Sequence, residues 1–113
     1  MVVEKILREN SSKKAIILHL NDVVSIPRNL MGYQTFLINV MGNPKLIQEL
    51  VELSVDINLE LAKEAVRKGV KIVYTGDDFA YTKGLLIPLN IFKKIFYPGF
   101  IKVIKGFFRL PAW

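Results

Sequence analysis

The sequence predicts an α/β fold with two parallel strands and flanking helices. Two short runs rich in β-branched residues, 15–20 and 70–76, have the length and composition of strands. Between them, residues 44–68 carry apolar side chains at spacings of three and four, which is a helical period. Strands that alternate with helices indicate right-handed βαβ units and a parallel sheet.

The composition limits the class of protein. The chain has 113 residues, no cysteine and a formal net charge of +6, so it suits one small domain without disulfides or thiolate-bound metal. Its cations are spread along the chain rather than clustered, which favours a solvated surface over a nucleic-acid site. No apolar run approaches the ~20 residues that span a bilayer. The first residues lack the pattern of a signal peptide, and we expect a cytoplasmic protein without a transmembrane segment.

The first third of the chain predicts a short helix at 2–9 and a polar break at 10–14. The continuous apolar run at 15–20 (AIILHL) predicts a strand buried in a parallel sheet. Residues 22–42 are mixed in character, and within them a short helix is expected at 35–41.

The helix at 44–68 has recognisable ends. Asn43 is a good N-cap residue, Pro44 suits the first helical position, and Gly69 is the expected residue after the C-cap. The apolar stripe that we expect to face the core consists of Leu46, Leu50, Leu53, Ile57, Leu61 and Ala65.

After the second strand, the sequence predicts a loop that runs to Pro88. Two helices then follow, at 90–96 and 98–105, and Gly106 is expected to end the second. The last residues have no readable period.

The second half of the chain also carries a family pattern. After a helix that ends in glycine, a strand finishes in Gly76-Asp77-Asp78, and a loop leads to the run 84–88 (GLLIP), followed by Phe92 and Pro98. Upstream, the segment 32–37 (GYQTFL) and the pair Asn43-Pro44 fit the same plan. Over roughly residues 15–105 the chain resembles the uroporphyrinogen decarboxylase superfamily, including its corrinoid-dependent methyltransferase branch.

The resemblance implies a fragment of a (β/α)8 TIM barrel. The chain would form about two central β/α units of a barrel that typically needs about 250 residues. Residues 1–113 would then be a single partial uroporphyrinogen decarboxylase-like domain, a truncated member of its family.

The family's chemistry follows from the same resemblance. Its members decarboxylate the acetate groups of a tetrapyrrole in porphyrin and heme biosynthesis, or transfer methyl groups to or from a corrinoid or a thiol. The family consists of lyases and methyltransferases. Whether this chain is itself an enzyme stays open, because its active site would be incomplete. We expect no cofactor in this chain, and zinc or a corrinoid partner only in a full-length methyltransferase-like homologue.

Four residues at the predicted C-terminal ends of the strands are candidates for substrate binding: Asp77, Asp78, Asn21 and Asp22. Active sites of (β/α)8 barrels lie at that end. Because side chains alternate along a strand, only one of Asp77 and Asp78 should face the pocket. The resemblance implies that Asp78 lies near a polar substrate contact, and that Asp77-Asp78-Phe79 is closer to the methyltransferase-like branch. The alternative for all four residues is turn formation through Asx hydrogen bonds.

Three further residues have two interpretations each. His19, the only histidine, is either a general base or a core or rim residue, and it cannot build a zinc site alone. Tyr74 and Tyr81 either line a pocket or pack as anchors.

Lysines and phenylalanines interleave along residues 92–109. This pattern is typical of a membrane-surface or RNA-binding helix, or of an outer barrel helix with a solvated lysine face, which we favour. We therefore expect no nucleic-acid partner.

Two functional hypotheses follow. The chain is either a piece of a uroporphyrinogen decarboxylase-like enzyme that a second chain completes, or a non-catalytic module that self-associates or binds a partner. Two strands cannot close a barrel, so their edges would stay unpaired. In the second hypothesis, an exposed apolar patch of Phe107, Phe108 and Trp113 would also lead the chain to self-associate or bind a partner.

Overall fold

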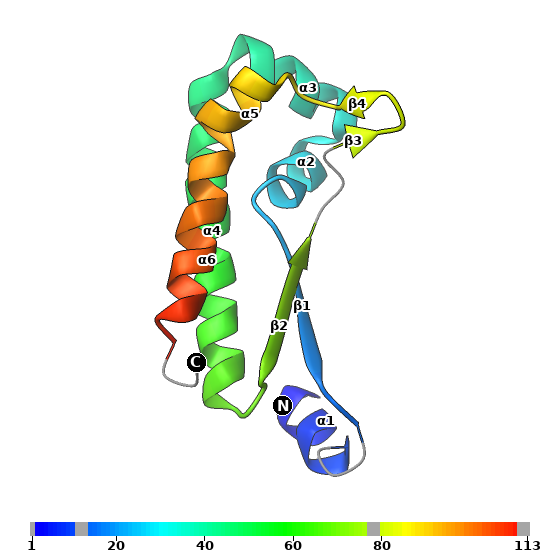
Figure 1. Ribbon diagram of the computed structural model, residues 1–113, viewed down its shortest axis with the longest axis vertical. Helices are drawn as coiled ribbons and strands as arrows, with labels where there is room; N and C mark the ends of the chain where they lie inside the picture. The colour runs from blue at the N-terminus through cyan, green and yellow to red at the C-terminus, as the bar shows by residue number, and fades with distance from the viewer. Residues whose placement is uncertain (1, 11–13, 77–79, 111–113) are drawn as a thin grey trace.

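The two predicted strands pair side by side in the computed structural model, which describes residues 2–10, 14–76 and 80–110. Strand β1 (Ile17–Asn21) and strand β2 (Ile72–Gly76) are parallel. His19 lies opposite Tyr74 in the register. The connection between the two strands ends in the 24-residue helix α4 (Pro44–Arg67), which runs beside them (Figure 1). The predicted α/β class, with two parallel strands and flanking helices, is therefore confirmed.

The remaining elements lie around this unit. Helix α1 lies near the N-terminal ends of the strands, and helices α2 and α3 follow β1 at the opposite end (Figure 1). Helix α6 lies alongside α4. The bounds are α1 (Val2–Asn10), α2 (Ser25–Met31), α3 (Tyr33–Gly42), β3 (Ala80–Tyr81), β4 (Gly84–Leu85), α5 (Leu89–Ile95) and α6 (Tyr97–Phe108).

Helix α2 and the β3–β4 pair were not predicted. Helix α2 falls in the mixed segment and holds Pro27 in its first turn, where the missing backbone N–H needs no helical partner. The segment expected to be a loop up to Pro88 contains the antiparallel pair β3–β4. Both elements are too short for a periodic pattern to reveal them.

The C-terminal end of α4 was predicted correctly. Gly69 has φ +107°, a conformation that side-chain-bearing residues rarely adopt. The N–H of Val70 donates to the carbonyl of Ala65 at 3.0 Å, and the N–H of Gly69 donates to the carbonyl of Val66 at 3.0 Å. These two bonds form a Schellman motif, which satisfies carbonyls that the helix leaves open. Lys68 also pairs with Glu4 at 3.3 Å, which ties α1 to this end.

The face of α4 that is buried differs from the predicted one. The side chains of Leu53, Ile57 and Leu61 are exposed. Ala65 of the predicted stripe is buried as expected, but otherwise a neighbouring row faces the core: Ile47, Val51, Ser54, Val55, Asn58, Ala62 and Val66. Both rows have a helical period, and the buried row is built from small and β-branched side chains, which allow other elements to approach closely.

Helix α6 makes the closest of these approaches. A Cβ placed on Gly99 would lie 2.6 Å from Cγ1 of Val51, and one on Gly106 would overlap the side chain of Leu59. The expectation that Gly106 ends the helix is therefore wrong, because α6 continues to Phe108. The glycine provides room for a neighbouring helix rather than a stop.

The core lies between the helices rather than around the strands. Its buried members are Val23, Val24, Phe36, Val40, Ile47, Val51, Val55, Ile87, Ile95, Phe96 and Val103. The prediction that residues 15–20 form a buried strand is wrong, since only Leu20 of β1 is buried. A parallel strand is buried when both faces of its sheet are covered, and the described elements cover one face.

The molecule is open in shape. Its radius of gyration is 16.0 Å, against about 13 Å expected for a compact domain of this length. Its accessible surface is 7672 Å², against about 6,300 Å² expected for a folded monomer of this mass. In the part of the chain that the structure describes, no helix combines the length and apolar character needed to cross a membrane.

Candidate functional site

The C-terminal ends of β1 and β2 meet at one edge of the sheet, beneath α2 (Figure 1). Asn21 lies opposite Gly76 at this edge, and Asp22 follows directly. Polar side chains at such an edge are positioned by rigid strands, which is where barrel enzymes place their substrate contacts. Of the four predicted substrate-binding residues, Asp77 and Asp78 lie outside the described residues.

Asp22 is only 2% exposed and has a structural role. Its Oδ1 accepts hydrogen bonds from the backbone N–H of Val24 at 2.9 Å and of Ser25 at 3.4 Å. These bonds hold the turn that leads from β1 into α2, as the turn interpretation predicts. The carboxylate of Asp22 therefore fixes the backbone directly after the end of β1.

Asn21, in contrast, is exposed. Because side chains alternate along a strand, it shares a face of the sheet with Ile17 and His19, and those three residues lie opposite Gly76, Ile72 and Tyr74 in the register. This face, which we call the open face, is the one that the helices do not cover. Asn21 is therefore placed where a ligand at the C-terminal edge can reach its carboxamide.

His19 and Tyr74 form a pair on the open face. Their ring centroids are 4.9 Å apart, with an angle of 40° between the ring planes. Tyr74 is 56% exposed and His19 is also exposed, so neither is a core residue. Of the core-or-rim interpretation of His19, the core half is therefore wrong, because the strand that carries it is uncovered on that side; the rim position is consistent with the structure, and the general-base role stays a prediction.

The Tyr74 side chain runs toward the C-terminal edge. A Cβ placed on Gly76 would lie 2.9 Å from Oη of Tyr74 and 3.3 Å from its Cζ. The phenol therefore occupies space that any other residue at position 76 would fill. The alternation of residues 72, 74 and 76 could have placed these residues on one face, but the contact with His19 depends on the strand register, which a single sequence does not specify.

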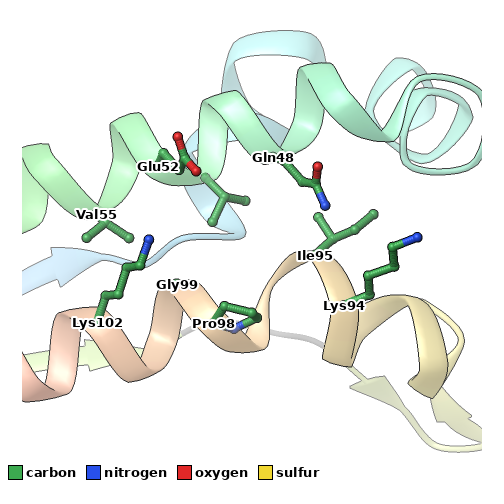
Figure 2. A pocket seen from close by; sticks show the side chains of 9 residues that line it. Gln48, Glu52, Val55, Lys94, Ile95, Pro98, Gly99 and Lys102 are labelled. Carbon is green, nitrogen blue, oxygen red and sulfur yellow. The ribbon is translucent and has the colours of Figure 1, made fainter.

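Hollows also lie elsewhere on the described part of the molecule, and two of them border helix α6. One, of about 220 Å³, lies between α4 and α6, and its lining includes Glu52, Gly99 and Lys102 (Figure 2). It is on the helical side of the molecule, and its mixed charges are typical of a solvated helix surface. The other hollow, of about 180 Å³, is apolar and is lined by Val73, Ile104, Phe107 and Phe108.

Helix α6 has the character of an outer helix. Phe100 and Phe107 pack against the core, whereas Lys102 and Lys105 are exposed. The apolar inner side and the exposed lysine face that we favoured are therefore present, and the place of α6 in a barrel stays a prediction. Within the described ranges, no three His, Asp or Glu side chains are grouped so that they could hold a metal ion.

Comparison with known proteins gives no relative: no protein-family model, curated protein or solved structure matches the chain. The fold and the site therefore define its class. It is an α/β protein with a parallel strand pair that is covered by helices on one face and open on the other.

Proposed function

We propose that this chain supplies two β/α units to a (β/α)8 barrel of the uroporphyrinogen decarboxylase type. The C-terminal edge of β1 and β2 would form part of the substrate pocket of that barrel. One observation carries the proposal: among the described residues, apolar side chains are exposed at three places where a β/α unit of a closed barrel would meet a neighbour. These neighbours are the barrel interior, the preceding unit and the following unit.

The first surface is the open face of the sheet. Ile17 and Ile72 lie opposite each other on it, and both are exposed. Barrel interiors are filled by layers of side chains from alternate strands, with bulky branched residues dominating. In a closed barrel this isoleucine pair would belong to such a layer, and the polar Asn21 would lie toward the pocket.

The second surface is the exposed row of Leu53, Ile57 and Leu61 on α4. Each of these residues comes two positions after one whose side chain a Cβ on Gly99 or Gly106 of α6 would meet, namely Val51, Val55 and Leu59. Two residues turn an α-helix by about 200°. The exposed row therefore faces away from α6, on the side where the helix of a preceding unit would pack.

The third surface lies between β2 and the end of α6. Phe108 is 77% exposed, and with Ile104 and Val73 it lines the apolar hollow. Within the described residues β2 pairs only with β1, so its other edge presents free backbone groups. An unpaired edge beside an apolar hollow suits a further strand.

The reaction follows from the resemblance. A completed barrel would either decarboxylate tetrapyrrole acetate groups or transfer a methyl group to or from a corrinoid or a thiol. In either reaction Asn21 would hydrogen-bond a polar group of the bound molecule. The remaining catalytic groups would come from the polypeptide that completes the barrel.

Co-purification tests the proposal. The chain is co-expressed with a polypeptide that supplies the six other β/α units of a uroporphyrinogen decarboxylase-like barrel, and the complex is assayed for both reactions. A one-to-one complex with either activity is the expected result. Leu61→Lys should weaken the complex, whereas Lys63→Glu, at an exposed polar position of α4, is the control and should not. Failure of the wild-type chains to associate contradicts the proposal.

The same surfaces favour a second candidate function, a non-catalytic module that self-associates. Its specific support is the edge of β2 that has no strand partner among the described residues and lies beside the exposed Phe108, since a second copy could cover both. A stable symmetric dimer that ignores the completing polypeptide would support this candidate over the barrel.

A further inference from the structure

We propose that one end of the molecule binds the surface of a membrane that contains anionic lipids. This end, which we call the apolar tip, consists of α2, α3, α5 and the segment 84–88. It lies at the opposite end of the long axis from α1 (Figure 1). The proposal goes beyond the barrel and does not depend on it, because none of the three surfaces assigned to barrel neighbours belongs to the tip.

Helix α3 exposes apolar side chains and has no charged residue. Tyr33 is 50% exposed, and Ile38 and Met41 are each 63% exposed. The opposite side of the helix is buried through Phe36 and Val40. A helix that is apolar on both sides is typical of a buried environment. The outer side of α3 therefore has the character of a covered surface, although no described residue covers it.

The neighbours of α3 extend this apolar surface. One small hollow is lined by residues of α2, of α3 and of the segment 86–87, so these three parts of the chain meet. The rings of Phe36 of α3 and Phe96, directly after α5, lie with their centroids 6.0 Å apart. Leu30 of α2 is 66% exposed and Leu89 of α5 is 53% exposed. The tip is therefore one packed unit with exposed apolar side chains on three helices.

The charges indicate what covers the tip. Cations are spread along the whole chain, but acidic residues are not. Segments 23–48 and 80–110 hold two and six Lys and Arg residues, respectively, and no Asp or Glu. Among them, Lys45, Lys93 and Lys94 are exposed at the tip or directly beside it. Cations that surround an apolar surface match anionic lipid headgroups around an acyl layer.

The described acids next to these segments do not oppose this binding. Asp22 is buried, and its carboxylate accepts hydrogen bonds from its own turn. The acids of α4 begin at Glu49, in the second turn, and continue along the helix away from the tip. The molecule is 48 Å long. A flat surface can therefore meet the tip while most of the acidic residues of α4 stay distant from it.

The expected binding is peripheral. Helix α3 has 10 residues, which give it a length of about 15 Å, whereas a membrane-spanning helix needs about 20 residues. The exposed apolar side chains would enter the boundary between headgroups and acyl chains, and the lysines would contact the headgroups. Tyr33 suits this boundary, because it combines an apolar ring with a polar hydroxyl.

Vesicle flotation with the full chain tests the proposal. One set of vesicles contains equal parts of phosphatidylcholine and phosphatidylglycerol, and the other contains phosphatidylcholine alone. Flotation on a density gradient separates bound protein from aggregates, which stay at the bottom. The chain should float with the anionic vesicles, less with the neutral ones, and less again as salt is added. No flotation with the anionic vesicles, or equal flotation with both, overturns the proposal.

Two variants locate the binding surface. Ile38→Asp should weaken binding to the anionic vesicles about tenfold or more, because it removes an apolar side chain and adds a repelled charge. Leu61→Asp makes the same kind of change at a 51% exposed position of α4, outside the tip, and should float like the wild type. Circular dichroism checks that both variants keep their fold. Flotation of Ile38→Asp like the wild type overturns the role of the tip.

A protein partner at the tip would give a different result. The chain would then ignore both kinds of vesicle, and Ile38→Asp would reduce the size of its assemblies in light scattering without lipid. That outcome contradicts the membrane proposal and assigns the tip to a protein interface. Lys93→Glu adds a further test, since it should weaken binding to the anionic vesicles and leave binding to the neutral ones unchanged.

Discussion

Gly106 of α6 lies so close to Leu59 of α4 that a Cβ on the glycine would overlap the leucine side chain. The contact between these two helices therefore depends on the absence of a side chain at one position. Near the start of the same helix, a Cβ on Gly99 would lie 2.6 Å from Cγ1 of Val51. The two glycines bring α4 and α6 together over the core.

Gly106→Ala should destabilise the chain by about 1–3 kcal/mol, because inserting a methyl group into a packed contact forces neighbours out of place. Chemical denaturation measures the change. Gly42→Ala is the matched control, since a Cβ there meets nothing within 4 Å and the φ of Gly42 is negative. A loss at Gly106 no larger than that at Gly42 would show that the helices do not pack as described.

Gly69→Ala should cost about 1 kcal/mol or more, for a different reason: the backbone there has φ +107°, which strains any residue with a Cβ. Space is not limiting, because the nearest side-chain atom is 3.9 Å away. The same denaturation experiment applies. An unchanged midpoint would mean that α4 does not end in a Schellman motif.

Asp22→Ala should destabilise the chain by about 1 kcal/mol, since two backbone N–H groups lose their acceptor. Asp22→Asn keeps an oxygen at that position and should lose less. The difference between the two variants, measured by thermal unfolding, separates the hydrogen bonds from the negative charge. Equal stability of the wild type and Asp22→Ala would contradict the turn described here.

Substitutions in the buried row and in the exposed row of α4 should differ in their effect on the free energy of unfolding. Val55→Ala empties part of the core and should cost about 1–2 kcal/mol. Leu53→Ser changes an exposed position, so stability should stay within about 0.5 kcal/mol while self-association decreases. Unfolding and light scattering measure the two effects. If Leu53→Ser were the more destabilising change, the originally predicted row would be the buried one.

Glu64 offers a test of the C-terminal end of α4. A hydrogen bond from Arg67 lowers the pKa of Glu64, and the charges of Arg67 and Lys68 lower it further. A lowered pKa in the folded state means that this pair contributes stability above the unfolded-state pKa and loses it as the pH falls through the folded-state value. Arg67→Gln should raise the pKa of Glu64 toward its ordinary value, which an NMR titration of the carboxyl carbon measures. An unmoved pKa contradicts the pairing.

Local chemistry explains what the sequence predicts well. Pro44 and Gly69 set the ends of α4 through backbone geometry that depends on a few neighbours only. The β-branched runs likewise predict both strands, to within two residues at each end. The parallel pairing follows from the length of the connection between them.

The features that the sequence does not predict depend on tertiary contacts. Two apolar rows on α4 have the same period, and the neighbours of the helix decide which one is buried. A glycine after an apolar helical run usually indicates the end of the helix. The actual role of Gly106 is to make room for Leu59 of α4, a contact that the sequence does not specify. The pairing of His19 with Tyr74 needs the register of two strands that are 55 positions apart in the chain. The predicted roles of Asp77 and Asp78 stay predictions.

The central claim is that the chain is an open part of a larger α/β assembly, with apolar surfaces that require a partner. Light scattering together with circular dichroism on the purified chain tests it most directly. We predict a self-associated species with a mixed helix and strand spectrum, which converts to a one-to-one complex when the completing polypeptide is added. A folded, monodisperse monomer that is indifferent to that polypeptide would contradict the claim.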